Sequence, residues 1–305
     1  MAFPSRSAEI EVNVVDKKSA GSLSGWLNGL IGVFIFSGSL PATRVAVQEI
    51  DPLFLTFIRA SIAGMLALIL VLSFREQCPK RSQIGSLVIV ALGVVIGFPL
   101  LTAMALQSVT SAHSIVFLGL LPLATAIFGV IRGGERPQFA FWIFSIVGSL
   151  LVVGFAFSQN VSISQTGDLL MLAAIVVCGL GYAEGAKLSR ELGGWQVICW
   201  ALLISLPFML LASFTTLPVT PGSISPECWF ALGYVSVFSM LIGFIFWYKG
   251  LAVGGIAAVG QLQLLQPFFG LALAATLLHE KVSVLMVIVT LGVIACVVGS
   301  RKFAR

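Results

Sequence analysis

The sequence is dominated by long apolar runs, each about the length of a membrane-spanning helix and separated by short links. A helix needs about 20 predominantly apolar residues to cross the hydrocarbon core of a bilayer. Alternating segments of about ten residues, typical of transmembrane β-strands, are not seen. We therefore predict an all-α integral membrane protein with ten transmembrane helices, at Ser24–Val47, Pro52–Phe74, Ile84–Met104, Ser111–Ile131, Pro137–Phe157, Asp168–Leu188, Trp195–Thr215, Glu227–Lys249, Ile256–Leu278 and Val282–Ser300.

Composition excludes most other classes. The chain is 58% hydrophobic and 10% charged, whereas a soluble domain carries about 25% charged residues. The net charge of +5 lies in short clusters between the runs rather than on a basic face, which argues against nucleic acid. The five Cys residues have no metal-ligand spacing. We expect no cofactor and no metal, a monomer, and two partners: the lipid bilayer and a small-molecule substrate.

The positive charges predict the orientation of the chain. If the amino terminus is cytoplasmic, fourteen of the 17 Lys and Arg residues fall in cytoplasmic segments. The links around Gln107, Asn160 and Val219, on the other side, carry none. Lys and Arg accumulate in cytoplasmic loops, so we expect both termini inside and a multi-pass protein of the bacterial cytoplasmic (inner) membrane. Residues 1–23 are polar and lack the apolar core of a signal peptide, and we interpret them as a flexible cytoplasmic leader.

An internal repeat divides the ten runs into two halves. At a shift of 145 positions Pro122 meets Pro267, and Glu135-Arg136 meets Glu280-Lys281. At a shift of 146, an aromatic residue followed eight positions later by Arg recurs as Phe36 and Arg44, then Tyr182 and Arg190. Each half holds five runs, an odd number, so the halves enter the membrane from opposite sides. Inverted repeats of this kind are typical of secondary transporters. We predict a first five-helix repeat at 24–157 and a second at 158–305.

The order of several short motifs resembles a known family. Residues 36–44 read FSGSLPATR, 121–122 LP, 134–136 GER, 247–251 WYKGL, 265–267 LQP and 279–281 HEK. Together they resemble the drug/metabolite transporter superfamily, in its EamA-like ten-helix branch. Within that branch the chain is most similar to YddG-type exporters of aromatic amino acids. It departs from the family where an aromatic-Gly pair and a Lys are commoner, at Phe36-Ser37 and Arg44.

The resemblance implies a basket of helices around a central cavity, lined by helices 1, 3, 4, 6, 8 and 9. Positions near the middle of these spans are candidate substrate contacts: Ser37, Phe98, Phe117, Tyr182 and Phe244. An apolar cavity with few polar groups suits a phenyl or indole side chain. Core packing explains each aromatic residue equally well.

Polar residues within the runs are further candidates. Gln261, Gln263 and Gln266 precede Pro267 in the ninth run. Unpaired amides in hydrocarbon are costly, so they contact substrate or water, or else hydrogen-bond between helices. His113, early in the fourth run, could bind a carboxylate, carry a proton or serve as a buried structural donor.

The remaining candidates concern mechanics and charge. Pro122 and Pro267 occupy equivalent places and are predicted hinges. Arg59 lies about seven residues inside the second run, where we expect a structural anchor paired with Glu49 or Asp51. Glu184 forms a local ion pair with Lys187, or else serves as a coupling or gate site.

The predicted function is a secondary transporter or facilitator that exports small metabolites, mainly amino acids with aromatic or apolar side chains, by alternating access. Alternatives are export of another metabolite or an amphipathic drug, and a channel. A membrane enzyme is disfavoured because we find no HExxH motif, no Cys pair and no phosphate-binding Gly loop.

Overall fold

The structure is a computed structural model that describes residues 23–109, 114, 117–158, 164–217, 222, 224–270, 272 and 284–304. All regular secondary structure in these ranges is helical. Six helices are long and apolar enough to cross a membrane: Leu23–Ala46, Pro52–Ser73, Arg81–Ser108, Gln165–Leu192, Gly194–Thr215 and Pro226–Gly254. Two shorter apolar helices lie at Leu121–Gly133 and Phe139–Phe155. The predicted all-helical membrane class is therefore confirmed.

Several spans are built from more than one helical segment, with bounds close to the predicted runs. The first span has a turn at Gly38 and ends in α2 (Ser39–Ala46). The others are α3 (Pro52–Ser73), α4 (Arg81–Val90) with η1 (Ala91–Gly97) and α5 (Phe98–Ser108), α7 (Leu121–Gly133), α8 (Phe139–Phe157), α9 (Gln165–Leu192), α10 (Gly194–Thr215), α11 (Pro226–Gly233) with η3 (Tyr234–Ile242) and α12 (Gly243–Gly254), α13 (Ile256–Gly260) with η4 (Gln261–Leu265), and α15 (Val284–Phe303). The count of ten stays a prediction, because parts of the fourth and ninth runs lie outside the described residues.

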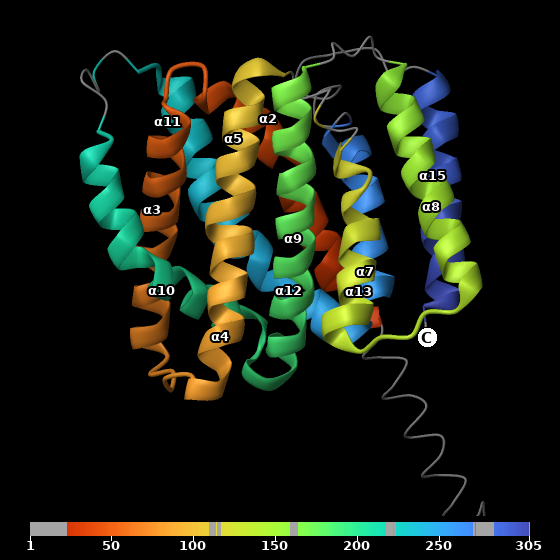
Figure 1. The fold of residues 1–305 in the computed structure, drawn as a ribbon, viewed down its shortest axis with the longest axis horizontal. Helices are drawn as coiled ribbons and strands as arrows, with labels where there is room; N and C mark the ends of the chain where they lie inside the picture. The colour runs from red at the N-terminus through yellow and green to blue at the C-terminus, as the bar shows by residue number, and fades with distance from the viewer. Residues whose placement is uncertain are drawn as a thin grey trace, which may run out of the picture.

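Helices far apart in sequence pack side by side as antiparallel pairs (Figure 1). Phe74 at the end of α3 contacts Trp195 at the start of α10, with ring centroids 5.5 Å apart. Gln138, just before α8, donates its backbone N–H to the carbonyl of Phe303 at the end of α15, at 2.9 Å. Gln83 at the start of α4 likewise meets Glu191 at the end of α9, at 3.1 Å. Each pair joins a helix of the first predicted repeat to one of the second.

Both described ends of the chain lie at one end of the bundle. The guanidinium of Arg301 lies over the ring of Trp26, 4.8 Å from its centroid. We call this end the terminal side. The last turns of α7, α9 and α15, which carry Arg132, Arg190 and Lys302, lie toward the same end (Figure 1). This is the end that the charge distribution predicts to be cytoplasmic.

The outer surface of the bundle is apolar. Phe208 and Leu211 on α10, Leu72 on α3 and Ile288 on α15 are all more than 55% exposed. A soluble protein rarely exposes contiguous apolar surface of this kind. Because these side chains face lipid, they do not have to be buried by other parts of the protein.

Turns between spans use residues with particular backbone freedom. The Asp51 carboxylate accepts from the backbone N–H groups of Leu53 and Phe54, at 2.9 and 3.1 Å, and so caps α3. Gly193 and Gly255 have φ of 99° and 97°, a region that side chains with a Cβ rarely enter. These glycines allow α9 to turn directly into α10, and α12 into α13.

Two π-helical segments occupy equivalent positions in the two halves. Shifting η1 by 145 residues places it on residues 236–242, inside η3. π-helical turns are rare and occur most often at functional sites. Phe98 follows η1 directly, and its equivalent at a shift of 146, Phe244, comes just after η3.

The first span crosses α12 at very short range through glycine. A Cβ added to Gly25 would lie 2.5 Å from the backbone nitrogen of Gly254. One added to Gly250 would lie 2.6 Å from that of Gly29. Small residues spaced four apart let membrane helices approach this closely.

Candidate functional site

A small cavity lies among the spans, in the half of the bundle away from the terminal side. Its volume is about 30 Å³, about the space that one water molecule takes in the liquid. The lining side chains come from the six spans that the family resemblance implies, with Arg59 of α3 in addition. In this conformation the cavity has room for water and not for a metabolite.

Repeat-equivalent residues line the cavity together. Val94 of η1 corresponds at a shift of 146 to Met240 of η3, and both line it. Leu121 corresponds at a shift of 145 to Gln266, and these two residues also line the cavity. Each precedes one of the two predicted hinge prolines, Pro122 and Pro267. The two halves thus contribute matching positions to one site.

An aromatic layer, made of Phe36, Tyr182, Phe244 and Trp247, closes the cavity toward the terminal side. The rings of Phe36 and Phe244 meet edge to face with centroids 5.1 Å apart. Tyr182 contacts Phe244 at 5.9 Å and Trp247 at 5.4 Å. Trp247 is fully buried. Edge-to-face packing of this kind adds stability beyond area burial, so these rings help to hold the first, sixth and eighth spans together.

Polar groups on the cavity wall are few. Ser39 donates its hydroxyl to Ser239 at 2.8 Å, which joins the first span to η3. Thr102 donates to the carbonyl of Phe98 at 2.7 Å, and the Gln266 amide donates to the carbonyl of Phe36 at 3.2 Å. These three contacts all lie within the bundle, and Thr43, Arg59 and Tyr182 are the other polar residues on the wall.

Of the predicted substrate contacts, Phe98, Tyr182, Phe244 and Gln266 line the cavity. Other predicted contacts lie in the packed interior, where Ser37 donates to the carbonyl of Phe34 at 2.6 Å and Gln261 donates to Ser145 of α8 at 3.0 Å. Phe117 packs with the cluster formed by Ala105, Val109 and Met171. His113, and the predicted loop residues His279, Glu280 and Lys281, lie outside the described residues.

Gln263 is unusual among the buried polar residues. Both polar atoms of its side chain are buried and neither has a hydrogen-bond partner. The indole N–H of Trp247 is in the same condition. Unsatisfied buried groups each cost about 1–3 kcal/mol. These unpaired groups beneath the cavity are candidates for contact with water or substrate in another conformation.

The prediction that Arg59 pairs with Glu49 or Asp51 is wrong. Glu49 instead accepts the backbone N–H of Ser225 at 2.6 Å, and this bond holds the pKa of Glu49 below its usual range. Asp51 caps its own helix. The Arg59 guanidinium turns inward and donates to the carbonyl of Val235 in η3 at 3.1 Å. Glu49 and Asp51 were expected as partners because they are close to Arg59 in sequence. Each of them instead accepts a hydrogen bond from a backbone N–H group.

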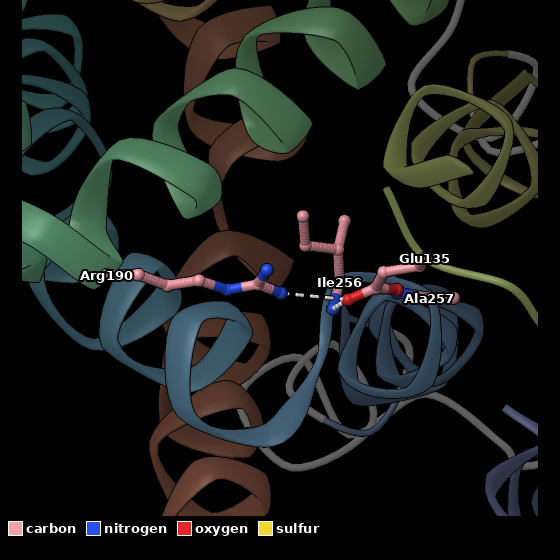
Figure 2. A network of polar contacts seen from close by, with 4 residues as sticks. All are labelled: Glu135, Arg190, Ile256 and Ala257. Carbon is pink, nitrogen blue, oxygen red and sulfur yellow. Dashed lines mark hydrogen bonds and ion pairs between the residues drawn. The ribbon is translucent and has the colours of Figure 1, made fainter. Parts of the chain in front are cut away.

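The terminal side is tied together by Glu135, which follows α7 (Figure 2). Its two carboxylate oxygens accept the backbone N–H groups of Ile256 and Ala257, each at 2.7 Å. One oxygen also accepts from Arg190 of α9 at 3.0 Å. A carboxylate at a helix amino terminus is favoured by the unpaired N–H groups and the helix dipole. This single side chain joins the ends of the fourth and sixth spans to the start of the ninth.

Glu184 lies on the same side and joins three spans. Its carboxylate accepts from Arg132 of α7 at 2.7 Å and from Ser86 of α4 at 2.6 Å. Glu184 is fully buried. The predicted local pairing with Lys187 is therefore not its main contact, because the helix face of Glu184 points into the bundle.

Sequence reasoning missed the joint role of Glu135 and Arg190. Both were noted only as repeat markers at cytoplasmic ends. The sequence signal was that Glu135 and Arg190 each have an equivalent charged residue in the other half, Glu280 and Arg44. Contact between two residues 55 positions apart could be seen only in the tertiary structure.

A second, wider groove of about 940 Å³ opens beside α11 and η3. Trp229, Phe230 and Phe238, all exposed, line it. Its wall is almost wholly apolar and faces outward, like the rest of the exposed apolar surface of the bundle.

Comparison with known proteins gives consistent results. The model of the EamA-like transporter family matches twice, at residues 23–157 and 165–301. An uncharacterized transporter, YdeK of Bacillus subtilis (strain 168), is 66% identical over 282 residues, which cover 92% of this chain and 98% of that protein. An uncharacterized transporter of Archaeoglobus fulgidus is 25% identical over 257 residues, covering 82% of this chain and 87% of that protein.

One solved crystal structure has the same fold. It superposes with a TM-score of 0.73 and covers 92% of this chain and 98% of its own, at 18% sequence identity. The match supports the architecture.

Proposed function

Because the chain belongs to the EamA-like transporter family, we propose that it exports small metabolites, mainly amino acids with aromatic or apolar side chains, by alternating access. That it is a multi-pass membrane transporter rather than an enzyme follows from the family and from the relatives. The substrate class and the outward direction are the proposal. So are its place in the bacterial cytoplasmic membrane and its action as a monomer.

The observation that supports the proposal most is the cavity itself. It is a largely apolar space with aromatic walls, lined by both halves of the chain and closed on the terminal side. Apolar pockets with a few convergent polar groups suit ligands that have an apolar body and a polar end. The YddG-type resemblance points to the same ligands.

Alternating access is supported by the paired construction of the molecule. The family matches fall on two successive stretches close to the predicted repeats. Helices of one half pack antiparallel against those of the other, as in α3 with α10. In inverted-repeat transporters the halves exchange conformations around a central site. Glu135 ties three spans together on the terminal side, and a second state would break this tie.

Transport into proteoliposomes tests this function directly. A panel of amino acids, sugars and amphipathic cations is offered with and without a pH gradient. We expect saturable uptake of phenylalanine, tryptophan or leucine that unlabelled substrate inhibits. Uptake that rises linearly with concentration and resists competition would instead indicate a channel. Uptake restricted to the cations would favour the drug-export alternative.

A further inference from the structure

Arg59 is a buried cation whose bonding capacity is largely unused. It lies on α3 with 5% of its surface exposed, and it lines the cavity. One guanidinium nitrogen donates to the carbonyl of Val235 at 3.1 Å. The buried Nε has no hydrogen-bond partner. A guanidinium carries five N–H donors, so this environment satisfies only part of what the group requires.

No carboxylate balances this charge within the described residues. The cavity wall there contains no Asp or Glu. Glu49 and Asp51, the nearest acids in sequence, are bound to backbone N–H groups elsewhere. Charged side chains inside membrane segments are costly and usually pair with another charge or mark a substrate pathway. Arg59 has no such partner among the described residues, and an anionic substrate would supply one.

The rest of the cavity defines what such a partner looks like. Phe36, Phe98, Tyr182 and Phe244 present aromatic surface to the same space that Arg59 enters. The arrangement is therefore cationic at one position and aromatic around it. An ammonium group would find no acid in the described part of this wall, and Arg59 would repel it.

We propose that Arg59 binds the carboxylate of the transported molecule, so that the cavity selects monocarboxylates with an apolar or aromatic body and rejects amines that lack a carboxylate. This inference rests on the proposed function and narrows it, because the carboxylate of an amino acid becomes the required group and its ammonium does not. Arginine suits the role since its planar fork matches a carboxylate in two hydrogen bonds.

A purely structural role for Arg59 is the competing explanation. Its bond to Val235 ties α3 to η3, and a role limited to that tie predicts loss of stability without any change in ligand preference. The two explanations therefore differ in ligand selectivity, which is the quantity to measure.

The test uses three ligands of one shape: phenylalanine, 3-phenylpropionate without the ammonium, and phenethylamine without the carboxylate. Uptake of labelled phenylalanine into proteoliposomes is competed with the other two. In the unmodified protein, 3-phenylpropionate is expected to inhibit at a concentration at least tenfold lower than phenethylamine. Arg59→Gln should abolish this preference, and Arg59→Lys should retain part of it, because the charge remains.

The control variant is Arg44→Gln, which removes another cation from the same half of the bundle. Arg44 donates to the carbonyl of Leu106 and does not line the cavity. The Arg44→Gln variant should prefer the carboxylate ligand as strongly as the unmodified protein does. An equal loss of preference in Arg44→Gln would show a general effect of positive charge and overturn the assignment to Arg59.

Thermal unfolding of the detergent-purified protein provides the second measurement. We expect 3-phenylpropionate to raise the Tm of the unmodified protein and not that of Arg59→Gln. If Arg59→Gln fails to fold, the Arg59→Lys variant and the ligand preference of the unmodified protein still distinguish carboxylate binding from a purely structural role of Arg59. Equal inhibition by phenethylamine and 3-phenylpropionate, or undiminished stabilisation of Arg59→Gln, would overturn the proposal.

The same data separate this inference from the proposed function. If phenylalanine is not transported but 3-phenylpropionate still stabilises the protein in an Arg59-dependent way, amino-acid export fails and the carboxylate site stands. If phenylalanine is transported equally well by Arg59→Gln, the function stands and the carboxylate site fails.

Discussion

Replacing Glu135 with Ala should open the terminal side of the transporter. The Glu135 carboxylate accepts two backbone N–H groups at the start of α13 and one guanidinium N–H from Arg190 (Figure 2). Opening this side separates α9 and α7 from α13, so all three contacts are expected to exist only in the closed state. Their loss should therefore shift the equilibrium toward the open state.

The size of the shift follows from the geometry. Losing a side-chain cap costs about 0.5–2 kcal/mol, and the upper end applies here because the acceptor is a charged carboxylate. The Arg190 side chain is 40% exposed, so the ion pair adds at most about 1 kcal/mol. A total near 3 kcal/mol corresponds to roughly a hundredfold larger open fraction, at about 1.4 kcal/mol for each tenfold.

Chemical labelling of a buried position measures this fraction. Thr125→Cys is a suitable probe, since Thr125 is fully buried on α7 and faces Gly260 of α13. Cys78, which is exposed, is first replaced with Ser. Maleimide should then modify the probe roughly a hundredfold faster when Glu135 is Ala, as expected from the shifted equilibrium.

Two further variants give an internal scale. Arg190→Gln removes only the exposed ion pair and should raise the labelling rate by less than about fivefold. Glu135→Gln keeps one acceptor oxygen and should fall between the two. A labelling rate for Glu135→Ala within twofold of the parent, or no greater than that of Arg190→Gln, would refute the reasoning. A Tm within a few degrees of the parent excludes general unfolding.

Three other predictions concern packing, hinges and pH. Gly250→Ala should lower the Tm clearly, because the new methyl group would overlap the backbone of Gly29 and force the first span away from α12. Pro122→Ala and Pro267→Ala should slow transport more than they lower the yield of folded protein, whereas equal losses of both would count against hinges. Glu49 has a lowered pKa, so the stability from its bond to the start of α11 is complete above its ordinary pKa of 4.5 and is lost as the pH falls from there through the lowered pKa. Glu49→Gln should remove that part of the acid dependence of Tm, and an unchanged profile would contradict the contact.

Much of the architecture could be predicted from the sequence because the bilayer restricts the choices. A run of apolar residues such as Pro52–Phe74 has to form a helix, since lipid offers its backbone no hydrogen bonds. The structure begins this helix at Pro52 and ends it at Ser73. A shift of 145 residues relates Pro122 to Pro267 in the sequence. In the structure, the residues directly before these two prolines line the same cavity.

The site was less predictable, because it depends on which faces of the helices meet. Midplane depth selected both Tyr182 and Ser37, yet only Tyr182 lines the cavity while Ser37 donates to the carbonyl of Phe34. Depth along a span is fixed by residue number. Rotation about the helix axis is set by packing against neighbours, and the π-helical segment η3 changes it further for Phe244.

The sequence by itself determined that the chain crosses a membrane many times and contains two related halves, because both properties depend on residue order and on the cost of placing polar groups in lipid. Only the tertiary structure decided where the charges go. Arg59 reaches a cavity rather than a loop acid, and Glu135 caps a helix 121 residues further along the chain. The physical reason is that a charged side chain binds the partner that folding brings within hydrogen-bond distance, and such partners need not be close in sequence.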